Sequence, residues 1–130
     1  MVRSLVEAGR AKLIEGLFSE ASAYIERGDA VQSSEKLYKA AEECIKALAE
    51  HFNLEEVKAA EDKGRWTVTL LEKAVGKLVE KLGMDVEIAW AEANYLHTWG
   101  FHETKLDIQD VKRRVPTIRK LIDLNKEDLD

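Results

Sequence analysis

The chain has 130 residues, of which 45% are hydrophobic and 35% are charged. This length is most simply one domain with its own core, and the composition excludes both a disordered chain and a membrane-spanning protein. The net charge of −5, from 20 basic and 25 acidic residues, excludes a protein that coats nucleic acid without sequence preference.

The N-terminal segment and the cysteine content indicate a cytoplasmic protein. Glu7 follows soon after Met1, and no apolar stretch of signal-peptide length precedes it. Cys44 is the only cysteine, so it cannot form an intramolecular disulfide, as is typical of a reducing compartment. Charged residues are abundant while Asn, Gln and Cys are scarce, which favours a thermophilic source.

The first two predicted helices form a hairpin. Apolar residues recur every three or four positions between Ile14 and Ile25, which predicts a helix over residues 3–27. Gly28 ends it, and Asp29 is a good N-cap for a second helix over residues 30–52. Because only two residues separate the helices, we expect them to pack antiparallel.

The middle of the chain predicts a short helix followed by a longer one. Asn53 is placed to cap the short helix, residues 54–62. The longer helix covers residues 65–82, where apolar residues are spaced 3, 4, 3, 4. Gly76 lies inside it at a cost of about 1 kcal/mol relative to alanine, so we expect it to permit a close contact with another helix.

The last part of the chain predicts two further helices. Asp85 caps one that ends near Glu103, and Asp107 caps another that runs to about Leu124. The apolar repeat of the last helix continues through Pro116 without a change of register, which predicts one kinked helix rather than two. The acidic tail, residues 125–130, is predicted to fray.

These elements together predict an all-α fold. We expect a single domain over residues 1–130, arranged as an antiparallel four-helix-type bundle with an additional short helix. The chain contains no internal sequence repeat.

The segment from Asn94 to Glu103 carries the side chains best suited to chemistry. Asn94, His97, His102 and Glu103 are the candidate catalytic residues. The two histidines are five positions apart, about 140° around a regular helix, so they do not share a face. Zinc-binding pairs on one helix lie three or four positions apart.

Two interpretations of this segment remain open. Gly100 could distort the helix and bring His102 round to His97, with Glu103 or Glu92 completing a metal site. An imidazole could also act as a general base, although no nucleophile is marked out by its spacing. The simpler interpretation is a pair of partly buried, hydrogen-bonded histidines at a helix end, so we expect no metal ion and no cofactor.

A basic stripe lies opposite the apolar face of the predicted last helix and includes one residue just before that helix. It predicts either a track for RNA or DNA phosphates or a solvated face. We favour the solvated face because acidic residues flank the stripe. The basic residues are Lys105, Lys112, Arg113, Arg119 and Lys120.

The remaining conspicuous residues indicate packing rather than catalysis. Cys44 lies on an apolar helical stripe, so we expect a buried, inert thiol. Trp66, Trp90 and Trp99 are typical of core or interface anchors, and Trp99 is expected to be partly exposed at a homodimer face. The sequence contains no Gly-rich phosphate loop, Cys-x-x-Cys, His-Glu-x-x-His or Gly-x-Ser-x-Gly motif.

Two stretches of the sequence resemble a known family. The first is the alanine-rich segment 30–49, which follows Arg27-Gly28-Asp29. The second combines Tyr95-Leu96-His97 with Gly100-Phe101-His102-Glu103. Together, over residues 13–124, they resemble the PaREP family of archaeal proteins, small helical bundles related to or resembling HEPN domains.

The resemblance has limited implications for function. HEPN domains are four-helix bundles, often homodimeric, that act with nucleotidyltransferases or as RNases. Their RNase members use an arginine followed four to six residues later by histidine, whereas Arg65 is the nearest arginine before His97. We therefore expect a non-enzymatic interaction module with a protein or nucleotide partner and a possible homodimer. The alternative is an RNA-processing or nucleotide-handling protein with its site around His97 and His102.

Overall fold

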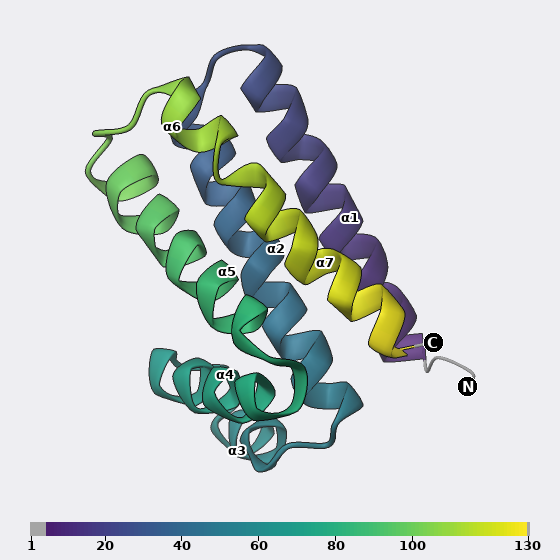
Figure 1. Cartoon of the computed structure of the whole chain (residues 1–130). Helices are drawn as coiled ribbons and strands as arrows, with labels where there is room; N and C mark the ends of the chain where they lie inside the picture. Colours follow the sequence, from purple (N-terminus) through teal and green to yellow (C-terminus); the bar gives the residue numbers. More distant parts are fainter. Residues whose placement is uncertain (1–4, 130) are drawn as a thin grey trace.

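All of the regular structure in the described part of the chain is helical. The computed structural model describes the backbone of residues 5–129 and the side-chain environment of residues 8–126, and no strand occurs in that part of the chain (Figure 1). Within the same range no helix is both long and apolar enough to cross a bilayer. The prediction of an all-α fold is confirmed. The elements are α1 (Leu5–Glu26), α2 (Ala30–His51), α3 (Glu55–Lys63), α4 (Val68–Leu82), α5 (Met84–Tyr95), the π-helical turn η1 (Leu96–His102), α6 (Ile108–Lys112) and α7 (Val115–Leu129).

Helix α2 is the centre of the molecule. It packs against α1, α4, α5, α7 and η1, while α3 and α4 lie at one end of the long helices and α6 lies at the other (Figure 1). Its apolar face is completely covered because the alanines between the larger side chains let neighbouring helices approach closely. The largest fully buried side chains of the core are Leu37, Ile45, Leu48, Leu78, Leu96, Ile118, Leu121 and Ile122.

The link between α1 and α2 follows the sequence prediction closely. Gly28 adopts a left-handed φ of 73°, a conformation that side chains disfavour. The Asp29 carboxylate then accepts a hydrogen bond of 2.9 Å from the Gln32 amide at the start of α2. The predicted end of the first helix is correct to one residue, while its predicted start at Arg3 lies outside the described residues.

Two predictions for the middle of the chain are wrong. Asn53 does not cap α3, because it adopts a left-handed φ of 53° and Leu54 takes the N-cap position without a side-chain bond. Gly76 makes no close helix contact, since a Cβ built there meets nothing within 4 Å. Helix α4 also begins three residues later than predicted, where the Thr67 hydroxyl accepts from the Leu70 amide.

Helix α5 begins before its predicted cap. Gly83, with a φ of 97°, takes the N-cap position, and Asp85 lies inside the first turn. An acidic side chain in a first turn still interacts favourably with the helix dipole. The helical path continues without a break through η1 to His102, close to the predicted end at Glu103.

The predicted kinked last helix is two helices. Asp107 caps α6 as predicted, through a reciprocal capping box with Asp110. However, Pro116 cannot donate to the carbonyl of Lys112 four residues earlier, and α6 ends at Lys112. Pro116 instead sits in the first turn of α7, where an amide donor is not needed.

The tail after Leu124 is better anchored than predicted. Helix α7 continues to Leu129, and Asn125 is 3% exposed. Its side-chain amide donates to the carbonyl of Cys44 at 3.2 Å and ties α7 to the centre of α2. The prediction of a frayed tail is therefore wrong for Asn125. The last residue of the predicted tail, Asp130, lies outside the described residues.

Candidate functional site

The π-helical turn η1 brings together side chains that a regular helix keeps apart. Each hydrogen bond of a π-helix joins residues five positions apart, whereas those of an α-helix join residues four positions apart. Here the Glu103 amide donates to the Thr98 carbonyl at 2.8 Å. Residues five positions apart then lie nearly one above the other. His97 and His102 face each other, with their Nε2 atoms 3.2 Å apart and their ring centroids 4.5 Å apart.

Gly100 allows this turn to lie directly against α2. A Cβ at this position would lie 2.1 Å from the hydroxyl oxygen and 2.6 Å from the Cβ of Ser34, which real side chains do not tolerate. The Ser34 hydroxyl is buried there and finds no hydrogen-bond partner among the described residues. The distortion around Gly100 that one of the two open interpretations required, with His102 brought round to His97, is present in the structure.

Helix α2 holds His97 in place from the other side. The Glu35 carboxylate accepts a hydrogen bond of 2.8 Å from His97 Nδ1, and the Tyr38 ring stacks on the imidazole at 4.1 Å between centroids. Phe101 lies nearly parallel to the imidazole at 6.2 Å. Burial, together with the nearby Glu42 carboxylate, raises the pKa of Tyr38 well above its usual value, so the phenol stays neutral.

Glu35 and Tyr38 were not identified from the sequence. They lie three positions apart and therefore on one face of α2. The sequence offered one signal for this contact, the pair Ser33-Ser34, because small residues on a buried face allow another helix to pack closely. The pattern does not indicate which helix packs there.

The other predicted catalytic residues do not join the histidines. The Asn94 side chain donates to the Trp90 carbonyl of its own helix at 2.8 Å. Glu103 is exposed, and Glu92 pairs with Arg114 at 2.6 Å. The cluster that forms is therefore Glu35, Tyr38, His97, Phe101 and His102.

The predicted basic stripe is largely occupied by ion pairs. Arg119 binds Glu15 and Asp123, and Arg113 binds Asp110 at 2.7 Å. Lys120 lies 4.0 Å from Asp85, while Lys105 and Lys112 are exposed. Phosphate binding needs uncommitted cations, so this pairing favours a solvated face.

The outer face of α5 and η1 carries an exposed apolar stripe. Met84 is 59% exposed, Ile88 49%, and Tyr95 and Trp99 43% each. The rings of Tyr95 and Trp99 lie 6.5 Å apart, and the Arg114 guanidinium covers the Tyr95 ring at 4.4 Å. Of the other two tryptophans, Trp90 is buried and donates to Glu72, and Trp66 is half-buried.

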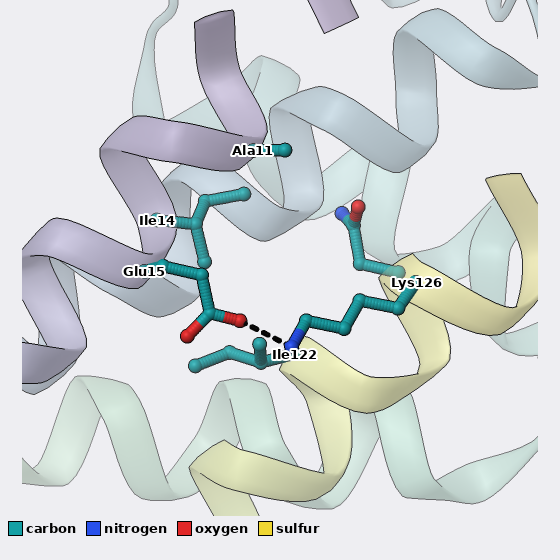
Figure 2. A pocket seen from close by; sticks show the side chains of 6 residues that line it. Ala11, Ile14, Glu15, Ile122 and Lys126 are labelled. Carbon is teal, nitrogen blue, oxygen red and sulfur yellow. Dashed lines mark ion pairs between the residues drawn. The ribbon is translucent and has the colours of Figure 1, made fainter. Parts of the chain in front are cut away.

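A cavity between α1 and α7 is too small for a substrate. It has a volume of about 40 Å³, enough for only a few water molecules, and Figure 2 shows how Ala11, Ile14 and Ile122 line it. The ion pair of Glu15 with Lys126, at 2.6 Å, lies across its rim.

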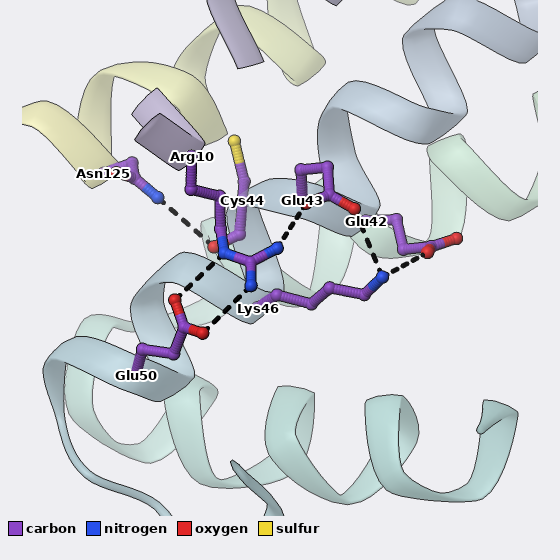
Figure 3. A network of polar contacts seen from close by, with 7 residues as sticks. All are labelled: Arg10, Glu42, Glu43, Cys44, Lys46, Glu50 and Asn125. Carbon is purple, nitrogen blue, oxygen red and sulfur yellow. Dashed lines mark hydrogen bonds and ion pairs between the residues drawn. The ribbon is translucent and has the colours of Figure 1, made fainter. Parts of the chain in front are cut away.

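A second polar cluster joins α1 to the C-terminal half of α2 (Figure 3). The Arg10 guanidinium forms two hydrogen bonds of 2.9 Å with the Glu50 carboxylate and a third with Glu43. Lys46 pairs with Glu42 and Glu43 at 2.8 and 3.2 Å. Burial lowers the pKa of Arg10, but pairing with Glu50 and Glu43 outweighs this and raises it overall, so the cation is permanent.

Comparison with known proteins assigns the chain to a family. Residues 9–122 match the archaeal PaREP1/PaREP8 family. The chain belongs to this archaeal family. The family predicted from the sequence is therefore confirmed. No curated protein matches the chain.

Two solved structures share the fold of this PaREP1/PaREP8 family member. A crystal structure of a protein from the thermophile Sulfolobus solfataricus is 39% identical, with a TM-score of 0.82, and the match covers 91% of this chain and 97% of that chain. A solution structure of the Orf c02003 protein is 39% identical, with a TM-score of 0.78, and the match covers 90% of this chain and 91% of that chain. Both solved structures carry the target designation SsR10. The thermophilic origin of the first agrees with the composition of this chain.

Proposed function

We propose that this protein is a helical interaction module that pairs with a second copy of itself through the exposed stripe on α5 and η1. The observation that carries the proposal is the run of four large apolar side chains on one continuous helical path, Met84, Ile88, Tyr95 and Trp99. The largest exposed apolar patch of a protein is often a functional surface.

The size of the stripe supports a symmetric pairing. With roughly 200 Å² for each large side chain, exposures of 43–59% leave about 400 Å² of apolar surface. That is about half of the ~800 Å² that each partner contributes to a stable interface, and the polar rim can supply the rest. Pairing about a two-fold axis uses the same patch twice, so one stripe serves both partners.

The polar groups beside the stripe do not oppose burial. Arg114 is already neutralised by Glu92, and its guanidinium lies over the Tyr95 ring. A contact made here therefore desolvates a paired cation rather than a bare one.

Light scattering coupled to size-exclusion chromatography tests self-association. We expect the wild-type protein to elute as a dimer and Trp99→Asp or Ile88→Asp to elute as a monomer. Val68→Asp is the matched control, because Val68 is 73% exposed but lies on α4 outside the stripe, and it should remain dimeric. A wild-type monomer at about 100 µM would exclude the proposal.

The HEPN-like arrangement is part of the same proposal. In this proposal α1, α2, α5 with its extension η1, and α7 form the antiparallel four-helix core, and α3, α4 and α6 are additions at its ends (Figure 1). This is supported by the packing of α2 against the other three and of α5 against α7. The homodimers common among HEPN domains make self-association the expected use of the outer face.

RNA or nucleotide handling is the second candidate function, and the convergence of His97 with His102 favours it. Two imidazoles in contact can exchange a proton with a bound substrate. Incubation with end-labelled RNA tests this candidate, with His102→Ala as the probe and His51→Ala as the control. Cleavage lost only in His102→Ala would support it, and equal cleavage by all three proteins would exclude it.

A further inference from the structure

We propose that His97 and His102 form a binding site for a transition-metal dication of the zinc type, and that Glu35 orients His97 for this purpose. The proposal concerns neither self-association nor RNA chemistry and can be tested without either. It also departs from the expectation from sequence that no metal binds, which followed from the simpler interpretation of a hydrogen-bonded pair of histidines.

The separation of the two ring nitrogens suits one shared ion. Their Nε2 atoms lie 3.2 Å apart, with the ring planes at 83° to each other. In a tetrahedral zinc site with bonds of ~2.0–2.1 Å, two ligand nitrogens lie about 3.3–3.4 Å apart. An ion can therefore replace the histidine–histidine hydrogen bond when the rings move by a few tenths of an ångström.

The contact with Glu35 prepares His97 to be a ligand. A carboxylate can only accept, so the proton of the neutral imidazole sits on Nδ1 and the lone pair remains on Nε2, the atom that faces His102. Metal-bound histidines almost always donate their other ring nitrogen to such a partner. Stacking on Tyr38 at 4.1 Å further restrains rotation of the ring.

The backbone supplies the second, independent argument. A π turn is rare, has weaker hydrogen-bond geometry than an α-helix and occurs frequently at functional sites. Here the wide turn aligns His97 with His102, and Gly100 lets it reach Glu35 and Tyr38 on α2. A core-packing role alone does not require two imidazoles to converge near the surface.

The donor set defines the class of ion. Imidazole nitrogens select zinc, copper, nickel and cobalt, whereas magnesium and calcium prefer oxygen ligands. Among residues 8–126, whose side chains the structure describes, no third histidine, cysteine or carboxylate completes the set. The remaining coordination positions would hold water or an anionic ligand atom, as in sites that keep open coordination.

Calorimetric titration of the full chain with Zn²⁺ and with Co²⁺, with the visible spectrum of bound Co²⁺ as a second readout, tests the site. We expect one ion per chain. His102→Ala should weaken binding at least ~30-fold, and Glu35→Gln, which removes only the orienting charge, should weaken it about 10–100-fold. His51→Ala is the matched control, because His51 packs against Phe52 at the far end of α2, and it should bind like the wild type.

His102 is exposed, so its replacement should leave the fold intact, and circular dichroism of each variant checks this. Absence of binding to the wild type, or equal affinities of the wild type and His102→Ala, would overturn the proposal. Loss of metal binding in His51→Ala would also overturn the proposal. An unchanged affinity in Glu35→Gln would overturn it too, because it would mean that the metal binds a chance pair of histidines that Glu35 does not orient. Trp99→Asp, which is expected to be monomeric, should bind metal like the wild type. The metal proposal and the self-association proposal can therefore fail independently.

Discussion

Helix α2 carries two polar clusters that differ in one decisive respect. Near its C-terminal half, Arg10, Glu42, Glu43, Lys46 and Glu50 use their charges on one another (Figure 3). Near its N-terminal half, the cluster around Glu35 ends in two histidines, one of them exposed. The first cluster is closed by ion pairs and joins helices, whereas the second ends in a histidine–histidine contact that a metal ion could replace. The kind of partner that a polar group has, rather than its polarity alone, therefore distinguishes the two clusters.

The largest expected effect comes from comparing two glycines within helices, Gly100 beside the histidine cluster and Gly76 on α4. Gly100→Ala should destabilise the protein by about 2–3 kcal/mol, because the new methyl group overlaps Ser34 in a packed contact. Gly76→Ala should instead stabilise it by up to about 1 kcal/mol, since that position faces open space within α4. Urea unfolding monitored by circular dichroism measures both changes.

A double variant sharpens this test. Ser34→Gly removes the atoms that the new methyl group meets and should restore part of the loss in a Gly100→Ala background. Additive effects of the two substitutions would mean that Gly100 does not set the distance between η1 and α2.

Breaking the closed cluster should have the next largest effect. Arg10→Met should reduce stability by about 2 kcal/mol, because it leaves Glu50 unpaired and Glu43 paired with Lys46 alone, and these carboxylate side chains are only 19% and 15% exposed. The control Lys36→Met removes an ion pair to Glu20, whose side chain is 54% exposed, and should change stability by about 0.5 kcal/mol or less. Thermal or urea unfolding of both variants gives the comparison, and equal losses would mean that the Arg10 cluster contributes no more than a surface pair.

The smallest expected effect appears only at alkaline pH. Burial raises the pKa of the Cys44 thiol above its usual value of 9.0, so the folded protein keeps a proton that the unfolded chain releases. Stability should therefore fall as pH rises above 9, by about 1.4 kcal/mol per pH unit for one group. Cys44→Ala should remove this contribution to the slope, while Tyr38, whose pKa is also raised, continues to act above pH 10. An unchanged slope in Cys44→Ala would contradict the prediction.

The sequence predicts what local patterns determine. Five of the six predicted helices, the caps at Asp29 and Asp107 and the burial of Cys44 follow from residue periodicity and short-range hydrogen bonding, and the structure confirms each of them. The split before Pro116 was misjudged because the apolar repeat keeps its register across a break of two residues. Periodicity reports which face is buried and does not report whether the backbone hydrogen bonds continue.

The candidate site could be predicted only in part. The presence of two histidines beside a glycine indicated a distortion, but the kind of turn depends on how η1 packs against Ser34. Glu35 and Tyr38 come from more than 50 positions earlier in the chain, and His97 is 62 positions from Glu35. A contact of that separation is a property of tertiary packing, which no local pattern encodes.

The wide turn at Leu96–His102 makes the contact between the two imidazoles depend on both the spacing of the histidines and the type of turn. Relative to an α-helix, such a turn accommodates one additional residue. If the same sequence formed a regular helix here, the two rings, five positions apart, would point about 140° away from each other. A chain shortened by one residue between His97 and His102 would instead have them four positions apart on one face of a regular helix and would not need the wide turn.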